Sequence, residues 1–218
     1  MNVNRIAKSL KRQMLKINNL KKFYGSHLAL QIGDLEFGEG IYWIKGHNGS
    51  GKSTLLKCLA GILSFNGEIS YEGFSLRKAP EKYLRFVNYS ATEPVYPDFL
   101  FGTHLLDLFF KCKGENSNHI DSMIECFGMQ DYISSQPISQ YSSGMLKKLS
   151  LLLAFVGNPR LILLDEPFIT LDLEASAFLS EWICRFKEKH CTIIMTSHLD
   201  SLPFPSEEIE LQKGILTN

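Results

Sequence analysis

The chain has 218 residues, a length that suits one large domain, or one domain with a subdomain, and that buries a core without disulfide or metal support. Lysine plus arginine equals aspartate plus glutamate at 23 each, so the net charge provides no general attraction to nucleic acid. Five cysteines without a C-x-x-C pair predict reduced side chains in a cytosolic protein. No apolar run reaches the ~18 residues of a membrane span, so the chain itself is not expected to cross a membrane.

The first 33 residues carry seven lysines and arginines and no aspartate or glutamate. We interpret residues 1–13 as a basic N-terminal extension, and a solvated terminus is favoured over contact with anionic lipid. Met14 is an alternative start, and the domain is expected to run over 14–218.

Hydrophobic patterning predicts an alternating α/β chain whose first part is rich in strands. The predicted strands of this part are 15–19, 28–35, 41–45, 68–71 and 86–89. A helix is expected to follow the third strand and to end near Leu63. The pair Asn66-Gly67 is expected to turn the chain into the fourth strand.

The middle of the chain repeats apolar residues at helical spacing, whereas the last part alternates strands and helices again. Helices are predicted over 105–112, 120–127, 146–155 and 174–189, strands over 161–164 and 192–195, and a hairpin over 209–211 and 215–216. The uninterrupted apolar run 161–164 is typical of a strand buried in a parallel sheet. The predicted plan is an α/β core interrupted by a helical insertion over about 90–158.

The loop from Gly46 to Ser53 fits the phosphate-binding pattern G-x-x-x-x-G-K-[ST] and lies between a predicted strand and a predicted helix. In such a loop, backbone N–H groups and the helix N-terminus surround phosphate oxygens. Lys52 is expected to reach the β- and γ-phosphates, and the Ser53 hydroxyl to bind Mg²⁺. The predicted nucleotide-binding residues of this loop are Gly46, His47, Asn48, Gly49, Ser50, Gly51, Lys52, Ser53 and Thr54.

A second candidate half of the site follows the buried strand 161–164, where Asp165 and Glu166 are adjacent. Ligands of parallel sheets bind at this carboxyl end of the strands. We expect Asp165 to hold Mg²⁺, directly or through water, opposite Ser53. Glu166 is the candidate general base for the attacking water. A solvated acidic turn is the alternative, and it is disfavoured because the same chain carries the phosphate-binding loop.

From about Met14 onwards the sequence resembles the ATP-binding cassette (ABC) family, and the order of its motifs carries the resemblance. The phosphate-binding loop is followed by Tyr141-Ser142-Ser143-Gly144-Met145, which is similar to the family signature, and then by Asp165-Glu166, Thr170-Leu171-Asp172 and Thr196-Ser197-His198. The resemblance implies an α/β fold with a P-loop NTPase core, in which a RecA-like mixed sheet is joined by an antiparallel β part, plus a helical insertion subdomain.

The resemblance also implies roles for residues that alone would carry little weight. Tyr24 would stack on adenine, and His198 would contact the γ-phosphate or the water and join Lys52 and Glu166 as a catalytic residue. Two domains would pair head to tail. Ser142, a good helix N-cap, and Gly144 would then face the γ-phosphate held by the other subunit. The ordinary alternatives are a core aromatic, a structural histidine and a helix cap.

Two motifs depart from the family pattern. Thr92 stands in the place of a glutamine that contacts Mg²⁺ or water, and an alignment slip of one residue would put Glu93 there. Because threonine is shorter, metal contact by Thr92 would require an inward movement of its loop or a bridging water. Ser143 and Met145 replace a glycine and a glutamine of the signature, and the methionine resembles exporter-like members.

The resemblance implies an ATPase subunit of an ABC transporter that uses ATP and Mg²⁺. It would form a homodimer, or a heterodimer with another ABC ATPase, and would power a separate membrane-spanning permease. Its expected location is cytoplasmic, on the inner face of the cell membrane through the permease, and no nucleic-acid partner is expected. Phe99 and Phe101 are candidates for permease contact. The alternative is a non-transport ABC ATPase that acts on ribosomes or nucleic acid. That alternative is disfavoured because such members usually carry two cassettes or long coiled-coil insertions.

Overall fold

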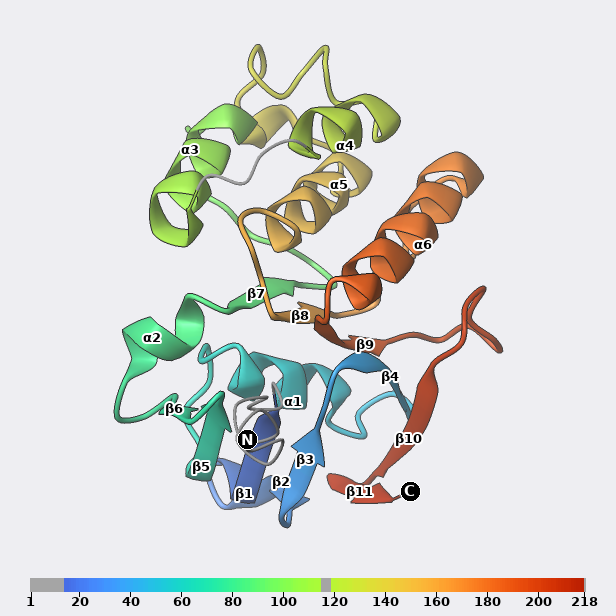
Figure 1. The fold of residues 1–218 in the computed structure, drawn as a ribbon. Helices are drawn as coiled ribbons and strands as arrows, with labels where there is room; N and C mark the ends of the chain where they lie inside the picture. The colour runs from blue at the N-terminus through green and yellow to red at the C-terminus, as the bar shows by residue number, and fades with distance from the viewer. Residues whose placement is uncertain (1–13, 115–118, 218) are drawn as a thin grey trace, which may run out of the picture.

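An antiparallel sheet forms one outer layer of the fold in the computed structural model, which describes residues 14–114 and 119–217 (Figure 1). The predicted extension over 1–13 lies outside these residues. The central strand β1 pairs antiparallel with β2, β3 and β5, and β6 pairs with β5. The strands of this sheet are β1 (Leu15–Tyr24), β2 (His27–Ile32), β3 (Leu35–Phe37), β5 (Asn66–Tyr71) and β6 (Phe74–Ser75).

A second sheet has six strands in the order β11-β10-β4-β9-β8-β7. Its neighbours are parallel except for the hairpin of β10 and β11. The carboxyl ends of β4, β7, β8 and β9 therefore open at one edge of the sheet. The strands are β4 (Gly40–Lys45), β7 (Val87–Ser90), β8 (Leu161–Leu164), β9 (Thr192–Thr196), β10 (Glu207–Gln212) and β11 (Ile215–Thr217).

The helices lie on both faces of the six-stranded sheet. Figure 1 shows α1 between the two sheets, whereas α3, α4, α5 and α6 gather on the opposite side. The helices are α1 (Lys52–Leu59), α2 (Pro80–Leu84), α3 (Gly102–Lys113), α4 (Ile120–Cys126), α5 (Ser143–Ala154) and α6 (Leu173–Glu188), with a short 3₁₀ helix over Ile138–Gln140. Helices α3 to α5 fall within the predicted insertion over 90–158, whose extent as a subdomain stays a prediction.

Alternation along the central strands builds two hydrophobic cores. On β4, Ile41 and Trp43 join the core under α3–α6, whereas Tyr42 and Ile44 join the core that holds α1 and the antiparallel sheet. Strands β8 and β9 divide their side chains in the same way. Because both faces of these strands are covered, their sequences are apolar at nearly every position, as predicted for 161–164.

Most predicted elements are present, but some boundaries are wrong. The predicted strand 28–35 divides into β2 and β3. Helix α1 ends at Leu59 rather than near Leu63, since Gly61 takes a left-handed φ of 72°. Asn66 and Gly67 begin β5 instead of turning the chain before it, and Asn66 pairs with Lys21 of β1. The short elements β6 and α2 have no counterpart in the sequence prediction.

Candidate nucleotide site

The phosphate-binding loop joins β4 to α1 through backbone conformations that favour glycine. Gly46 has a φ of 152°, and a Cβ at this position would lie 2.3 Å from the Leu211 carbonyl oxygen. Gly51, at the N-cap of α1, has a φ of 107°, and its Cβ would lie 2.7 Å from Leu30 Cδ2. The loop is therefore pressed against β10 and β2, which fixes the path of its backbone.

Lys52 opens α1 with a side chain that is buried against its own loop. Its Nζ donates to the carbonyl oxygens of Gly46 at 2.6 Å and His47 at 3.2 Å. The buried Ser50 Oγ has no hydrogen-bond partner within 14–114 and 119–217. The loop therefore contains an ammonium group and an unpaired hydroxyl, which can both donate hydrogen bonds to an anion.

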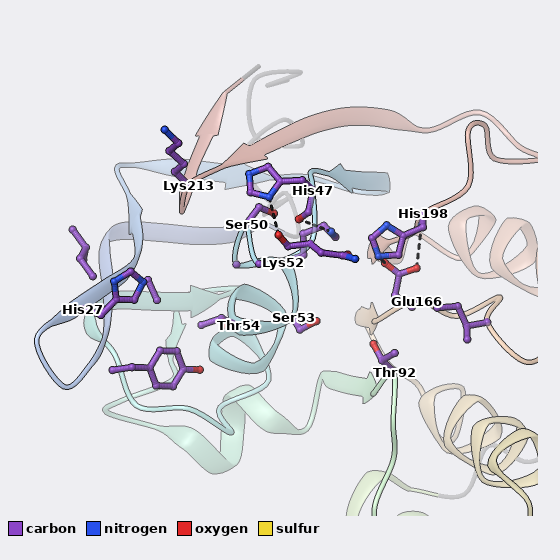
Figure 2. Close-up of a pocket in the computed structure, with 17 residues that line it drawn as sticks. His27, His47, Ser50, Lys52, Ser53, Thr54, Thr92, Glu166, His198 and Lys213 are labelled. Atoms are coloured by element: carbon purple, nitrogen blue, oxygen red, sulfur yellow. Dashed lines mark hydrogen bonds and ion pairs between the residues drawn. The ribbon is translucent and has the colours of Figure 1, made fainter.

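A cavity of about 710 Å³ surrounds this loop. Every loop residue from His47 to Thr54 lines it, and so do Tyr24, Thr92, Glu166 and His198. In Figure 2 the loop residues lie between His27 and Lys213 at one end and the group of Glu166, His198 and Thr92 at the other. The structure therefore brings the predicted residues of five separate segments to one cavity.

Asp165 connects the loop to the sheet through both carboxylate oxygens. Its Oδ1 accepts from Ser53 Oγ at 3.1 Å and from Thr196 Oγ1 at 2.8 Å, and its Oδ2 is 3.5 Å from the Tyr89 hydroxyl. The side chain is almost fully buried. Burial and the nearby Asp165 carboxylate raise the pKa of Tyr89, so this phenol stays a neutral donor. A hydroxyl and a carboxylate oxygen, both hard ligands, are thus adjacent at the loop, as a Mg²⁺ site requires.

Glu166 adopts an unusual left-handed backbone conformation with a φ of 47°. Its N–H donates to Thr196 Oγ1 at 3.0 Å, and its Oε2 accepts from the backbone N–H of His198 at 3.1 Å. His198 Nε2 lies 3.3 Å from Glu166 Oε1, without the alignment of a hydrogen bond. Burial raises the pKa of the Glu166 carboxyl, and the neighbouring His198 opposes this shift. A carboxylate with a raised pKa beside a histidine is typical of acid–base chemistry.

Thr92 lines the same cavity from the loop that follows β7. Its side chain is half-buried. In the described part of the chain no hydrogen bond joins it to Ser53 or Asp165. Its role as a metal ligand stays a prediction.

Ser142 and Gly144 do not line the cavity of their own chain. Ser142 is the N-cap of α5, as its residue type predicts, and its Oγ accepts from the Met145 N–H at 3.2 Å. Its side chain is exposed and Gly144 is half-buried. These two residues could therefore contact only a nucleotide that is bound by a second molecule.

Sequence reasoning missed five residues of the cavity wall, which are His27, Leu28, Ala29, Ile169 and Lys213. The pair Lys213-Gly214 is recognisable as a hairpin turn, but its neighbour in space is not. The Gly214 N–H donates to the Ser50 carbonyl at 3.0 Å, and the Gly214 carbonyl accepts from the Gln31 N–H at 2.8 Å. These bonds hold the turn between β10 and β11 against the phosphate-binding loop and β2.

Across 14–114 and 119–217, none of the helices combines the length and the apolar character that a membrane crossing needs. The same residues contain no group of three or more His, Cys, Asp or Glu side chains arranged to hold a metal ion.

Residues 33–169 match the family described as ABC transporter. The lantibiotic transport ATP-binding protein SrtF of Streptococcus pyogenes is 32% identical over 188 residues, which cover 85% of this chain and 80% of that protein. The ABC transporter ATP-binding protein NatA of Bacillus subtilis (strain 168) is 31% identical over 172 residues, which cover 76% and 69%.

A solved structure gives the same result. The structure described as an ATP binding subunit of an ABC transporter has a TM-score of 0.83 and 26% identity, and the match covers 93% of this chain and 88% of that one. The fold, the site and these similarities agree. The chain belongs to the ABC transporter family and is one of its ATP-binding, ATP-hydrolysing subunits.

Proposed function

We propose that this subunit hydrolyses Mg²⁺-bound ATP between two paired domains and thereby powers a separate membrane-spanning permease. The observation that carries the proposal is the meeting of Glu166, His198 and the phosphate-binding loop at one cavity. A base, a switch residue and an anion site from three segments are the parts that phosphoryl transfer to water requires.

The phosphate-binding loop and Asp165 are the proposed holders of the nucleotide and its metal. Lys52 exchanges carbonyl partners for phosphate oxygens, and the loop N–H groups bind the remaining phosphate charge. Ser53 and Asp165 would hold Mg²⁺, and Thr92, which lines the cavity together with Ser53, would contribute through water. When bound, Mg²⁺ supplies charge neutralisation at the phosphates. Tyr24, exposed at the cavity wall, is the proposed platform for adenine.

Glu166 is the proposed general base. Its buried carboxylate takes a proton from water as the water attacks the γ-phosphorus, the bond from that phosphorus to the bridging oxygen breaks, and ADP is the leaving group. The raised pKa of Glu166 brings its basicity closer to neutral pH. His198 lies beside the same carboxylate and is half-exposed to the cavity, so it can contact the γ-phosphate and orient the water.

A second domain is the proposed source of Ser142 and Gly144. Both lie at the N-terminus of α5, where the Ser142 hydroxyl, backbone N–H groups and the helix dipole favour an anion. A head-to-tail pair, of two copies or of this chain with another ABC ATPase, places this helix start over the γ-phosphate of the partner domain.

The proposed permease contact lies at a groove of about 350 Å³ whose wall includes Ile62, Val95, Tyr96 and Phe109. Val95 is 90% exposed, and the nearby Phe99 is 78% exposed. Exposed large apolar side chains beside a groove are typical of a protein interface. Phe101, the other candidate from the sequence, is the N-cap residue of α3, and its side chain is less exposed than that of Phe99. This contact would hold the subunit at the cytoplasmic face of the cell membrane.

The direction of transport is a separate question. Methionine at position 145 of the signature favours an exporter.

The experiment compares wild type, Glu166→Gln and Lys52→Ala with Mg²⁺ and ATP. Wild type is expected to release phosphate, and Glu166→Gln to release it at least about 100-fold more slowly because the base is gone. Light scattering after size exclusion should show Glu166→Gln as an ATP-dependent dimer and Lys52→Ala as a monomer. Equal phosphate release by wild type and Glu166→Gln would contradict the role of Glu166. A monomeric Glu166→Gln at saturating ATP would contradict the paired arrangement.

The alternative of action on ribosomes or nucleic acid has no observation in its favour among the described residues. The relatives SrtF and NatA are named for transport.

A further inference from the structure

A buried lysine of α5 joins the two loops that frame the proposed catalytic carboxylates. Lys147 is 1% exposed, which is unusual for a lysine. Its Nζ donates to the Ala91 carbonyl at 2.8 Å and to the Asp165 carbonyl at 2.8 Å. Ala91 directly precedes Thr92 in the loop after β7, and Asp165 directly precedes Glu166 at the end of β8. One side chain therefore connects both loops with α5, the helix that Ser142 caps.

Burial makes the charged form of Lys147 energetically unfavourable. Burial lowers the pKa of Lys147 to about 8, while the carboxylates of Asp165 and Glu166 act in the opposite direction. Taking an ammonium group out of water costs free energy that two carbonyl acceptors recover only in part. A long apolar side chain would fill this space at lower cost, so packing alone does not account for a lysine here.

Two further polar links make α5 and β7 a single unit. Asn88 Nδ2 donates to the carbonyl oxygens of Ala154 at 3.0 Å and Val156 at 2.9 Å, at the end of α5. The hydroxyl groups of Ser90 and Ser150 are 3.0 Å apart and both are buried. Lys147 continues this line towards the start of α5 and contacts the Asp165 carbonyl, while the Asp165 N–H donates to the Ser90 carbonyl at 2.9 Å. Lys147 therefore links α5 directly to the backbone that carries Asp165 and Glu166.

We propose that Lys147 is a positioning residue for ATP hydrolysis, which holds the backbone of Asp165 and Glu166 in register with the Thr92 loop and the start of α5. The loop after β7 has only the short Thr92 side chain facing the cavity. The Lys147 ammonium connects this loop to the end of β8 by binding a backbone carbonyl of each, Ala91 and Asp165. Because it acts on carbonyl oxygens outside the cavity, its loss should impair the chemical step more than nucleotide binding.

The test replaces Lys147 by Met in the full chain and measures kcat, KM for Mg²⁺-ATP and thermal unfolding. We expect kcat to fall about tenfold or more, since small displacements of a catalytic group are costly, while KM stays within about threefold. Lys147→Gln keeps an N–H donor on a shorter side chain, so it should recover about threefold of the lost kcat and remain below wild type. A purely structural role predicts no such recovery at unchanged KM.

Lys113 offers a control, because it is a half-buried lysine whose pKa is likewise lowered to about 8 by burial. Its Nζ also donates to two carbonyl oxygens, those of Leu84 and Val87, but neither residue lines the nucleotide cavity. Lys113→Met should lose stability as Lys147→Met does, yet keep kcat within about twofold of wild type.

Two results would overturn the proposal. One is a kcat of Lys147→Met within about twofold of wild type, and the other is an equal loss of kcat in Lys113→Met. Should Lys147→Met fail to fold, Lys147→Gln is the deciding variant. Its kcat is then expected about threefold below wild type at constant KM, and an unchanged kcat overturns the assignment.

Discussion

At the scale of single residues, two glycines of the phosphate-binding loop have opposite surroundings. A Cβ on Gly46 would lie 2.3 Å from the Leu211 carbonyl and 2.7 Å from Ser50 Oγ, whereas a Cβ on Gly49 would meet no atom within 4 Å. Both residues have positive φ, at 152° and 79°. Gly46 is therefore required by packing as well as by backbone conformation, and Gly49 by conformation alone.

Replacing each glycine by alanine should separate these two effects. Gly49→Ala is expected to lower the free energy of unfolding by about 1–2 kcal/mol, from the left-handed backbone. Gly46→Ala should cost about 3 kcal/mol or more, because overpacking against the backbone of β10 is added. Urea unfolding of both variants without nucleotide measures the difference. Equal losses would contradict the close contact between the loop and β10.

At the scale of elements, the residue that caps α6 also contacts α5. Asp172 Oδ1 accepts from the Ala175 N–H at 2.8 Å and caps α6. Its Oδ2 accepts from Lys148 of α5 at 3.1 Å. The Ala175 N–H, followed by Lys148, holds the pKa of Asp172 below its usual range. The ion pair itself is exposed and adds little, so the cap carries most of this contribution.

Asp172→Ala is expected to lower the free energy of unfolding at neutral pH by about 1 kcal/mol, while Asp172→Asn keeps most of the cap. Because the folded pKa is lowered, this stabilisation is fully present above the ordinary pKa of aspartate, about 3.9, and is lost as the pH falls through the lowered value. Urea unfolding from about pH 6 to pH 3 should show this loss in wild type and not in Asp172→Asn. The same pH profile in both proteins would rule out Asp172 as its source.

At the scale of the whole molecule, the six-stranded sheet separates two cores and carries the nucleotide site at one edge. The proposed permease groove lies beside β7 and α3, and its lining includes Asn88, Tyr89 and Ser150 of the α5–β7 unit. Strand β7 leads directly into the Thr92 loop of the nucleotide cavity. A partner seated in the groove would therefore contact the same unit that Lys147 joins to Asp165.

Val95→Asp, tested in the native complex, should reduce the amount of co-purified membrane protein about tenfold, because a charge would replace an apolar contact at the groove. Leu108→Asp is the matched control, since Leu108 is also exposed, at 51%, but does not line the groove. Thermal unfolding of the two isolated variants checks that both fold. Equal recovery of the membrane protein with Val95→Asp and with wild type would place the permease elsewhere.

The sequence alone determined the features that depend on neighbouring residues. Periodicity identified most strands and helices, the order of motifs identified the family, and the spacing of Gly46 to Ser53 located the phosphate-binding loop. The cap at Ser142 follows from its residue type at a helix start. Such features are local, because a hydrogen bond within one turn or an apolar alternation needs only a few consecutive residues.

Only the tertiary structure decided which distant segments share the site. The tertiary arrangement brings Gly214 to Ser50, Glu166 to His198 and Lys147 to both Ala91 and Asp165. None of these contacts follows from composition or spacing, because each joins residues from separate elements. Their distances depend on how two apolar faces of one sheet are covered at once.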